Sequence, residues 1–574
     1  MYEPLSLSWW NRISSLIIRP RRSLRDVPCA TSPSSPARGI RLSHPLSAPR
    51  SYSSCDTDNE SFYRYSGGRW LWDEEKQLQT RYKRFNVPEL QRLAAKSVEA
   101  QACVSMIKLA EGGFNKVFRL VMDDDSVVIA RIPNPNAGPS FKTTASEVAT
   151  MDFARTILKI PVPKVLAWSG SSKNPVGSEY ILMEEASGTP IYKVWEGMEI
   201  HDKLKIVDDI VDIEKKLLSI SFTRHGNLYF AADAFPGCEK AEIDGNAMQS
   251  EREETAKRFV IGPVVDTRFW SQGRDAMDID RGPWKKPEDY LKAIGDREIS
   301  WIRQYATPKP SHGSFSVSGA QNTPSSHVAL YEKFLAVADS LLPKKQDLVR
   351  STLWHWDIHA PNLFVHDGKV TSLIDWQDVW AGPLLLQARH PRLVRYDGEV
   401  MLKLPEYFGT LVDKEEKARI RTQVERSLVL WVYESGTKKC NPILHELSQL
   451  PQWRTIRDTI EFASNTWEGD ILPFRQCLIR IARHWDEINC HIPCPIGFTG
   501  DELEAHHRDG DGWNEEAEFW DSLQDFVHRD GWTSNETYDQ ALQMFAQLRQ
   551  RGLQHLTGEE RRHFEKQTRW ASTT

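Results

Sequence analysis

The chain has 574 residues, of which 40% are hydrophobic and 26% charged, and its 73 Lys and Arg against 79 Asp and Glu give a formal net charge of −6. This composition is typical of a folded protein with more than one folding unit, and it excludes a disordered chain or a minimal binding module. No global basic field attracts a phosphate backbone, so we expect no nucleic-acid partner. The 8 scattered cysteines indicate a reducing compartment. No stretch approaches the ~20 apolar residues of a transmembrane segment.

The first 55 residues differ from the rest of the chain. They contain eight Arg, no Lys, thirteen Ser and only two acidic residues. Because the matrix-negative potential attracts an amphipathic cation, this composition predicts a mitochondrial transit peptide over residues 1–55. Arg50-Ser51-Tyr52-Ser53 resembles a matrix processing site, so we expect a mitochondrial matrix protein, with an N-terminal extension over 56–100. A basic, Pro- and Ser-rich tail without a targeting role is the alternative.

A glycine turn lies in the region that we expect to form a small β-rich unit, residues 101–186. Within Leu109–Leu120, two apolar strands flank Gly112 and Gly113. Such a turn lets backbone N–H groups approach phosphate oxygens, which makes it a candidate nucleotide contact. An ordinary hairpin is the alternative.

The rest of this region contains two charged residues that are candidates for an ion pair, and a strand near its end. The apolar strand Val127–Pro133 carries one cation, Arg131, and the helix that follows carries Glu147, sixteen residues later. They are candidates for an ion pair, with a purely structural pair or two unrelated surface charges as alternatives. Tyr180–Gly188 has the pattern of a strand that ends at a glycine turn, and it includes Glu184.

Helices dominate the predictions for residues 187–574. A helix over 201–220 has one apolar face and one charged face. Pro308–Ser326 is rich in Pro, Ser and Gly and predicts a flexible, exposed insertion. The last third of the chain is predicted to be helical, with one apolar stripe at positions that include Val424, Leu428 and Trp431.

Polar residues bracket a predicted β-hairpin within Leu353–Gln377. Asp357 precedes the hairpin, Asn362 opens it and Asp375 closes it, so two carboxylates and an amide can converge on one point. Mg²⁺ takes oxygen ligands from one or two carboxylates together with substrate phosphates, and Asn362 with Asp375 would supply that minimum. A loop whose His and Asp cap neighbouring elements is the alternative for the isolated pattern.

These motifs resemble those of protein-kinase-like enzymes. His355-Trp356-Asp357-Ile358-His359-Ala360-Pro361-Asn362 is similar to the catalytic pattern H-x-D-x-x-x-x-N, and Ile374-Asp375-Trp376 is similar to the corresponding motif of aminoglycoside phosphotransferases. Phe259–Asp266 and Gln387-Ala388-Arg389-His390-Pro391 resemble segments of fungal phosphotransferase-family proteins, including the altered-inheritance-of-mitochondria group. The resemblance covers roughly residues 70–550.

The resemblance implies an α+β, two-lobed, protein-kinase-like fold that binds ATP and Mg²⁺. The small β-rich lobe would span 101–186 and the large, mainly helical lobe 187–574, with the catalytic loop at 355–375. The residues that would form the site are the catalytic Asp357, the metal ligands Asn362 and Asp375, and the nucleotide-binding residues Arg131, Glu147, Gly112, Gly113 and Glu184. Arg131 stands where the family usually has a Lys.

Two functions of different classes follow from these residues. The first is an ATP- and Mg²⁺-dependent phosphotransferase that acts on a hydroxyl of an unidentified, small-molecule acceptor. The complete set of Asp357, Asn362 and Asp375 favours it. The second is a catalytically silent pseudokinase that serves as a mitochondrial binding or scaffold protein, which Arg131 and the sparse glycine turn favour. Nothing in the sequence points to an acceptor or to an oligomeric state.

Overall fold

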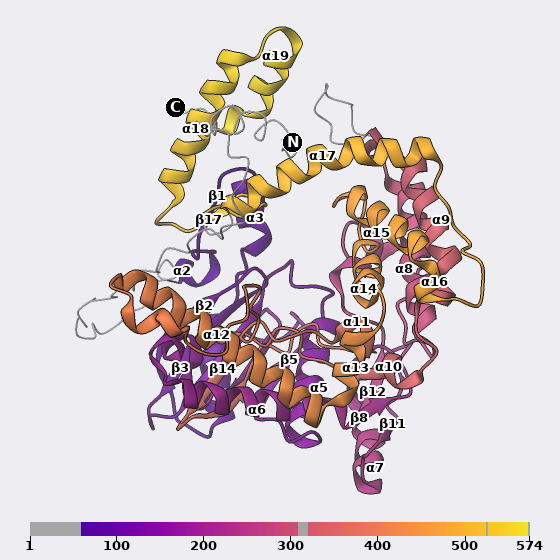
Figure 1. Cartoon of the computed structure of the whole chain (residues 1–574). Helices are drawn as coiled ribbons and strands as arrows, with labels where there is room; N and C mark the ends of the chain where they lie inside the picture. Colours follow the sequence, from indigo (N-terminus) through magenta and orange to yellow (C-terminus); the bar gives the residue numbers. More distant parts are fainter. Residues whose placement is uncertain (1–58, 308–318, 524–525, 572–574) are drawn as a thin grey trace. The chain divides into compact units, whose positions relative to one another are not determined.

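The computed structural model describes residues 59–307, 319–523 and 526–571 (Figure 1). The predicted transit peptide, residues 1–55, lies outside the described residues. The described chain separates into two compact units, one of residues up to 78 and from 512 onward, and the other of most residues in between. No helix in the described part of the chain combines the length and apolar character needed to cross a bilayer.

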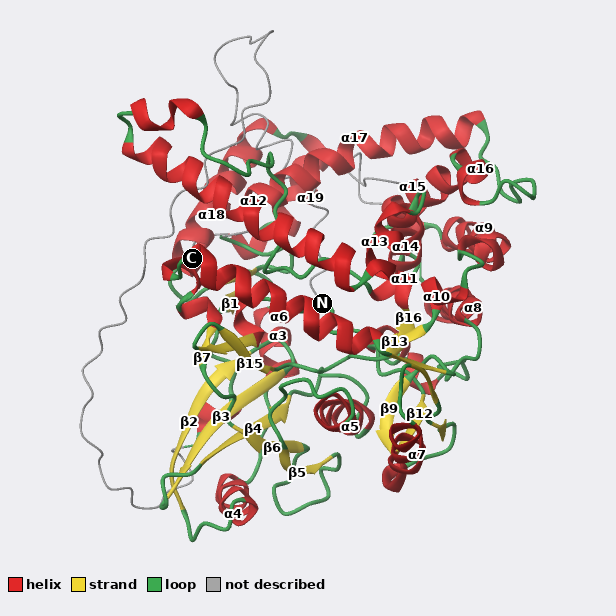
Figure 2. Cartoon of the chain, turned by 60° about the horizontal axis from the view of Figure 1, so that its bottom comes forward, coloured by secondary structure: helices red, strands yellow, loops and turns green. Residues whose placement is uncertain are grey.

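The larger unit begins with a five-stranded antiparallel sheet in the order β2-β3-β4-β6-β5 (Figure 2). Burial alternates strictly along β3, so one face of the sheet faces the core, while the central residues of β4 are buried throughout. The helix α5 (Lys142–Thr156) packs against β5 and β6, and α4 (Val87–Ser97) packs against β2, β3 and β4. The strands are β2 (Cys103–Glu111), β3 (Asn115–Met122), β4 (Val127–Pro133), β5 (Val165–Ser169) and β6 (Tyr180–Glu184).

A tight hairpin follows much later in the chain and has the predicted strands and turn. β14 (Leu363–His366) pairs with β15 (Lys369–Leu373), and β14 also pairs with the short β7 (Thr189–Pro190), which follows the first sheet. The two turn residues, Asp367 and Gly368, have φ values of +49° and +70°. Asp-Gly is suited to such a turn because both residues tolerate the left-handed region. The hairpin thereby fixes the positions of Asn362 and Asp375 at its open end.

Three pairs of helices pack together in the larger unit. α6 (Ile200–Leu218) packs against α12 (Lys414–Cys440), α8 (Pro287–Tyr305) against α9 (Pro324–Leu341), and α14 (Trp453–Phe462) against α15 (Ile471–Arg483). Their buried apolar side chains form one continuous cluster that also includes residues of α5. The other helices of this region are α7 (Gln249–Arg258), α10 (Gln346–Val349), α11 (Leu384–Gln387), α13 (Pro442–Gln449), α16 (Trp485–Ile488) and α17 (Gly500–Leu523), the last of which continues into the other unit.

Two small antiparallel sheets lie among these helices. One has the order β11-β8-β13-β16 and the other the order β10-β12-β9. Their strands are β8 (Ile220–Phe222), β9 (Asn227–Phe230), β10 (Glu239–Lys240), β11 (Ile243–Gly245), β12 (Phe259–Gly262), β13 (Ser351–Leu353) and β16 (Ala381–Pro383). A β-rich sheet with one long helix, followed by a mainly helical region that carries the hairpin, is the α+β kinase-like fold that the sequence predicts.

The smaller unit joins two distant parts of the chain. Its short helices α2 (Glu60–Tyr63) and α3 (Glu74–Arg81) flank β1 (Arg69–Trp70), which pairs with β17 (Trp532–Thr533), and its later helices are α18 (Tyr538–His555) and α19 (Gly558–Gln567). Leu71, Trp520 and Phe545 belong to its buried core. The segments expected from the sequence do not include this division. The paired strands β1 and β17 lie more than 460 residues apart, and no pattern within either segment indicates the other.

Part of the predicted flexible insertion 308–326 is ordered and packed. Residues 308–318 lie outside the described residues, but Gly319–Asn322 forms a 3₁₀ turn and α9 begins at Pro324. The Gln321 side chain donates to the carbonyls of Thr466 and Trp467 at 3.1 Å and accepts from the amide of Ile471 at 2.8 Å. The prediction was therefore wrong for residues 319–326. Gln321 is held by residues 145 and 146 positions away, which local composition does not reveal, and Pro324 is at the first position of a helix.

The apolar face of α12 is also different from the predicted one. The helix itself is present, but Trp431 is 50% exposed, and the buried residues include Val429 and Tyr433. The Tyr433 hydroxyl donates to the buried Glu214 carboxylate of α6 at 3.0 Å. A contact between residues 219 positions apart sets the rotation of the helix, and no periodicity within α12 reveals it.

Candidate active site

The loop from Asp357 to Asn362 is held by hydrogen bonds between its own residues. The Asn362 side-chain amide donates to the Asp357 carbonyl at 3.1 Å and to its carboxylate oxygen Oδ2 at 3.2 Å. The His359 ring nitrogen Nδ1 lies 3.0 Å from the same Asp357 carbonyl oxygen, while the other carboxylate oxygen, Oδ1, accepts no hydrogen bond from a described residue. The Asp357 carboxylate is partly exposed at 22%, so it is both oriented by the loop and accessible to a ligand.

His355 connects this loop to the end of the hairpin. Its buried ring nitrogen Nε2 lies 3.0 Å from the carbonyl oxygen of Ile374, and the ring packs edge-on against Trp376 at 4.9 Å. Burial lowers the pKa of His355, so the ring is neutral and the hydrogen bond assigns its proton to Nε2. The Ile374 amide in turn donates to the Asn362 carbonyl at 3.0 Å. These bonds set the position of Asp375 relative to Asp357 and Asn362.

Arg131 and Glu147 form a buried ion pair beside this loop. One guanidinium nitrogen of Arg131, on β4, donates to the Glu147 carboxylate of α5, and the other lies 3.5 Å from the Asp375 carboxylate. Burial lowers the pKa of Arg131, while Asp375 and Asp378 raise it, and a guanidinium remains charged in either case. The structure thus brings together five of the predicted site residues: Arg131, Glu147 and Asp375 by direct contact, and Asn362 and Asp357 through the loop.

Asp375 itself has an unusual backbone conformation. Its φ is +65°, in the left-handed region that Asp and Asn tolerate better than most residues. Its side chain is 47% exposed. The carboxylate is therefore displayed toward solvent, with the Arg131 guanidinium as its one ionic partner in the described chain.

Gln377 is a site residue that the sequence analysis missed. Its side-chain oxygen accepts hydrogen bonds from Arg131 and from the Asn115 amide, the latter at 2.7 Å, and its amide donates to the Ala137 carbonyl at 3.2 Å. Gln377 thereby ties β3 and β4 to the loop that carries Asp375. Its position two residues after Asp375, the predicted metal ligand, is the only feature of the sequence that indicates a role in the site.

Asn227, at the start of β9, was missed as well. Its amide donates to the Ser146 hydroxyl of α5 at 2.8 Å and to the Val379 carbonyl at 3.1 Å, and its oxygen accepts from the Val265 amide at 3.0 Å. Because Ser146 precedes Glu147, these bonds fix α5 against the helical region. Nothing near Asn227 in the sequence distinguishes it from other polar residues.

The glycine turn lies at an exposed position between β2 and β3. Neither Gly112 nor Gly113 has a left-handed φ, and a Cβ added at either would meet no atom within 4 Å. The Gly113 carbonyl accepts a hydrogen bond from the Asn136 amide at 3.1 Å. Neither backbone conformation nor packing requires glycine here, so the free space above the turn is available to a ligand.

Glu184 does not join the other site residues. Its carboxylate accepts a hydrogen bond from the Lys164 amide at 3.0 Å and lies 3.7 Å from Arg155. Its own backbone N–H donates to the Lys164 carbonyl at 2.9 Å. As the last residue of β6 it completes the pairing beside β5, and any contact with a nucleotide would have to come from the backbone that follows it.

Comparisons with known proteins agree with this geometry. Residues 315–386, which include Asp357, Asn362 and Asp375, match the profile of the phosphotransferase enzyme family. A subtelomeric hrmA-associated cluster protein of Aspergillus fumigatus is 30% identical over 488 residues, covering 78% of this chain and 92% of that protein. The mitochondrial protein named altered inheritance of mitochondria protein 9 is 26% identical in Yarrowia lipolytica, with 84% of this chain and 86% of that protein covered.

Solved structures give a more distant likeness. A thermostable mutant of the aminoglycoside phosphotransferase APH(4)-Ia is 12% identical, with 68% of this chain and 95% of that chain covered at a TM-score of 0.32. The fold assignment therefore depends on the sheet order and the hairpin of the chain itself. With 30% identity to a relative matched over most of its length, the chain belongs to the phosphotransferase enzyme family, among fungal proteins that include altered inheritance of mitochondria protein 9.

Proposed function

We propose that the chain transfers a phosphoryl group from ATP, with Mg²⁺, to a hydroxyl of a small-molecule acceptor. The observation that carries this proposal is the joint placement of Asp357, Asn362 and Asp375 beside the buried pair of Arg131 and Glu147. When bound, ATP supplies the phosphoryl group and Mg²⁺ neutralises the charge of its phosphates. The contribution of the protein is positioning and charge.

The donor atoms present fit a Mg²⁺ site. The Asn362 amide nitrogen is engaged by Asp357, and its oxygen accepts no hydrogen bond from any described residue. The Asp375 carboxylate is displayed toward solvent. Carboxylate and amide oxygens are ligands that Mg²⁺ prefers, and one or two from the protein suffice when phosphates supply the rest. Asn362 and Asp375 are therefore the residues that would hold the ion.

Arg131, with Glu147 behind it, would hold the nucleotide phosphates. A guanidinium can contact a carboxylate with one edge and a phosphate with another. Glu147 and Gln377 fix the Arg131 side chain in one orientation, which lowers the entropy lost on binding. The open space at Gly112 and Gly113 supports a close approach of phosphates to the backbone.

Asp357 would act on the acceptor. Asn362 holds its carboxylate through Oδ2, and the carboxylate can orient an acceptor hydroxyl and take its proton. His355 is neutral and contacts Ile374 rather than the carboxylate of Asp357. We assign it the role of a positioning residue for the loop.

The silent pseudokinase remains the second candidate, and one observation favours it. Each of the two key carboxylates has an arginine beside it: Arg131 at Asp375, and Arg392 at 3.4 Å from Asp357. These contacts reduce the negative charge available to a metal or an acceptor. However, Arg392 is 63% exposed, and an ion pair of such a group is weak enough to be displaced by a ligand. The Asp375 carboxylate is 47% exposed and stays accessible to a metal ion beside Arg131.

Asp375→Asn should abolish most of the effect of Mg²⁺ on ATP binding. Asn tolerates the φ of +65° but lacks the charge, and loss of even an outer-shell partner costs ~10–100-fold in metal affinity. Calorimetry of ATP binding with and without Mg²⁺ measures the effect. Asp367→Asn, in the exposed hairpin turn with φ +49°, is the matched control. If ATP binds the unaltered protein equally well without Mg²⁺, the metal site is wrong and the pseudokinase is favoured.

Asp357→Asn should lower turnover by ~10²–10⁴-fold and leave the affinity for ATP with Mg²⁺ within a few-fold, because positioned general-base catalysis contributes this much. Turnover of ATP against a pool of metabolites, ATP affinity and the thermal midpoint are measured on the same protein. A lowered midpoint would indicate a structural role for Asp357. Unchanged turnover in a well-folded variant would remove Asp357 from the catalytic role.

We further propose that the protein is imported into the mitochondrial matrix. The composition of residues 1–55 and the relatives named mitochondrial support this localisation. A fusion of residues 1–60 to a fluorescent reporter should enter the matrix and be cut near Ser53. A reporter that stays entirely in the cytosol would contradict the targeting role.

A further inference from the structure

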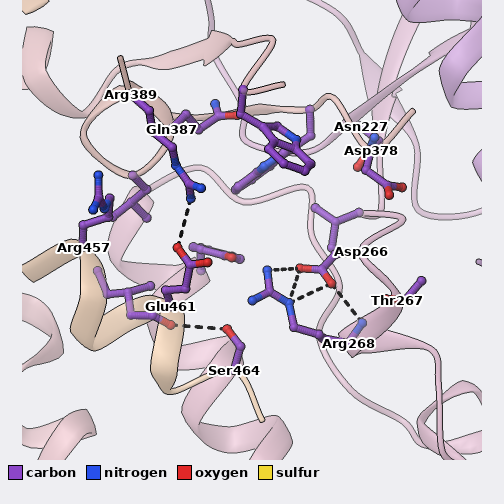
Figure 3. A pocket seen from close by; sticks show the side chains of 16 residues that line it. Asn227, Asp266, Thr267, Arg268, Asp378, Gln387, Arg389, Arg457, Glu461 and Ser464 are labelled. Carbon is purple, nitrogen blue, oxygen red and sulfur yellow. Dashed lines mark hydrogen bonds and ion pairs between the residues drawn. The ribbon is translucent and has the colours of Figure 1, made fainter. Parts of the chain in front are cut away.

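A cavity of about 310 Å³ lies beside the proposed catalytic loop (Figure 3). Its lining includes Trp356, which precedes Asp357, and Asp378, which follows Asp375 by three residues. The other walls come from the segment after β12, from α8 and from α14. Its volume is at the lower end of the ~300–1,000 Å³ of small-molecule sites. The cavity is therefore sized for a small compound, and it lies next to the segment that carries Asp357.

The charges that line the cavity are balanced. Figure 3 shows two ion pairs on opposite sides, with Arg268 contacting Asp266 at 2.7 Å and Arg389 contacting Glu461 at 3.0 Å. The third cation of the lining, Arg457, lies 3.1 Å from the Asp458 carboxylate, so each cation of the lining has its own carboxylate partner. A balanced lining creates no strong field of either sign. It favours neither a polycation nor a polyanion as the ligand.

Several hydrogen-bonding groups of the lining have no protein partner. The buried carboxylate oxygen Oδ1 of Asp378 accepts no hydrogen bond, and the buried Nε of Arg389 donates none. The Tyr290 hydroxyl makes no hydrogen bond with any described residue. Buried polar groups are normally satisfied, so this set of unpaired donors and acceptors calls for a ligand with both kinds of group.

Asp378 is suited to such a ligand. Burial and the neighbouring Asp266 raise the pKa of Asp378 to about 7, with Arg131 opposing them. Near neutral pH the side chain is therefore present in both protonation states, as a hydrogen-bond donor and as an acceptor.

Aromatic faces complete the cavity. Trp356 is 40% exposed, and the half-buried Trp380 packs against Tyr290 with ring centroids 5.0 Å apart. The C–H faces of a cyclic compound can pack on such rings, while its hydroxyls reach the polar groups between them. Apolar walls with a few convergent polar groups are typical of a small-molecule site.

We propose that this cavity binds the phosphoryl acceptor, and that the acceptor is a neutral, cyclic, polyhydroxylated compound of monosaccharide size. That the compound accepts a phosphoryl group rests on the proposed function. Its binding to the cavity does not depend on ATP. Hydroxyl groups both donate and accept, which matches the unpaired Oδ1 of Asp378 and Nε of Arg389 and the Tyr290 hydroxyl of the lining. Because the charges of the lining are balanced, we expect the cavity to bind a neutral compound more tightly than an amino-substituted, cationic one.

The test measures binding without nucleotide. D-Glucose, D-ribose and myo-inositol are compared with the cationic D-glucosamine and the anionic D-glucuronate, using saturation-transfer NMR and thermal shift on the whole protein. We expect at least one neutral compound to bind about tenfold more tightly than its charged counterpart. Tighter binding of the amine or the acid, or no binding of any neutral compound at millimolar concentration, would overturn the proposal.

Two variants assign the binding to the cavity. Trp356→Ala removes a partly exposed wall, and Asp378→Asn keeps the size of the side chain but not its charge or its second acceptor. Each should weaken binding of the neutral compound about tenfold, whereas Trp431→Ala, an exposed tryptophan of α12, should not change it. Equal affinities in all variants would overturn the cavity assignment. Binding without phosphate transfer would instead refute the proposed function and leave the cavity as a ligand site.

Discussion

The arrangement of the site depends on one buried guanidinium. Burying the charge of Arg131 is costly unless every nearby partner is in place, and those partners come from two separate segments: Glu147 on α5, and Asp375 with Gln377 in the loop after the hairpin. The strand β4, the helix α5 and the loop must therefore adopt their positions together. Because Ile374 is bonded to Asn362 and His355, the same constraint positions the whole catalytic loop.

Arginine at this position has consequences for the chemistry. A lysine ammonium is a compact point charge, whereas a guanidinium is a planar fork that can serve several partners at once. Arg131 uses this property to contact Glu147, Gln377 and Asp375 simultaneously. The substitution therefore does not by itself indicate an inactive site. It indicates a cation that is more firmly anchored to the protein, next to a metal ligand that is still exposed.

Local sequence patterns predicted the parts of the fold that depend on neighbouring residues. The Asp367-Gly368 turn specifies its hairpin, and the spacing around Asp357 specifies the catalytic loop, because backbone conformation within a few residues determines both. Contacts between side chains that are far apart in the sequence could not be predicted. Gln377 meets Arg131 across 246 residues and Asn227 meets Ser146 across 81. Trp431 was placed on the wrong face of α12 for the same reason.

The most direct test of the account replaces the buried pair of Arg131 and Glu147 together by methionine. An apolar pair of similar volume often maintains stability where an ion pair is removed whole, so the double variant should fold, as judged by circular dichroism and its thermal midpoint. Charge-assisted hydrogen bonds contribute ~1.5–3 kcal/mol each. We therefore expect a loss of at least about tenfold in the affinity for ATP, measured by calorimetry with Mg²⁺. A folded double variant that binds ATP as tightly as the unaltered protein would contradict this expectation and show that the pair has only a structural role.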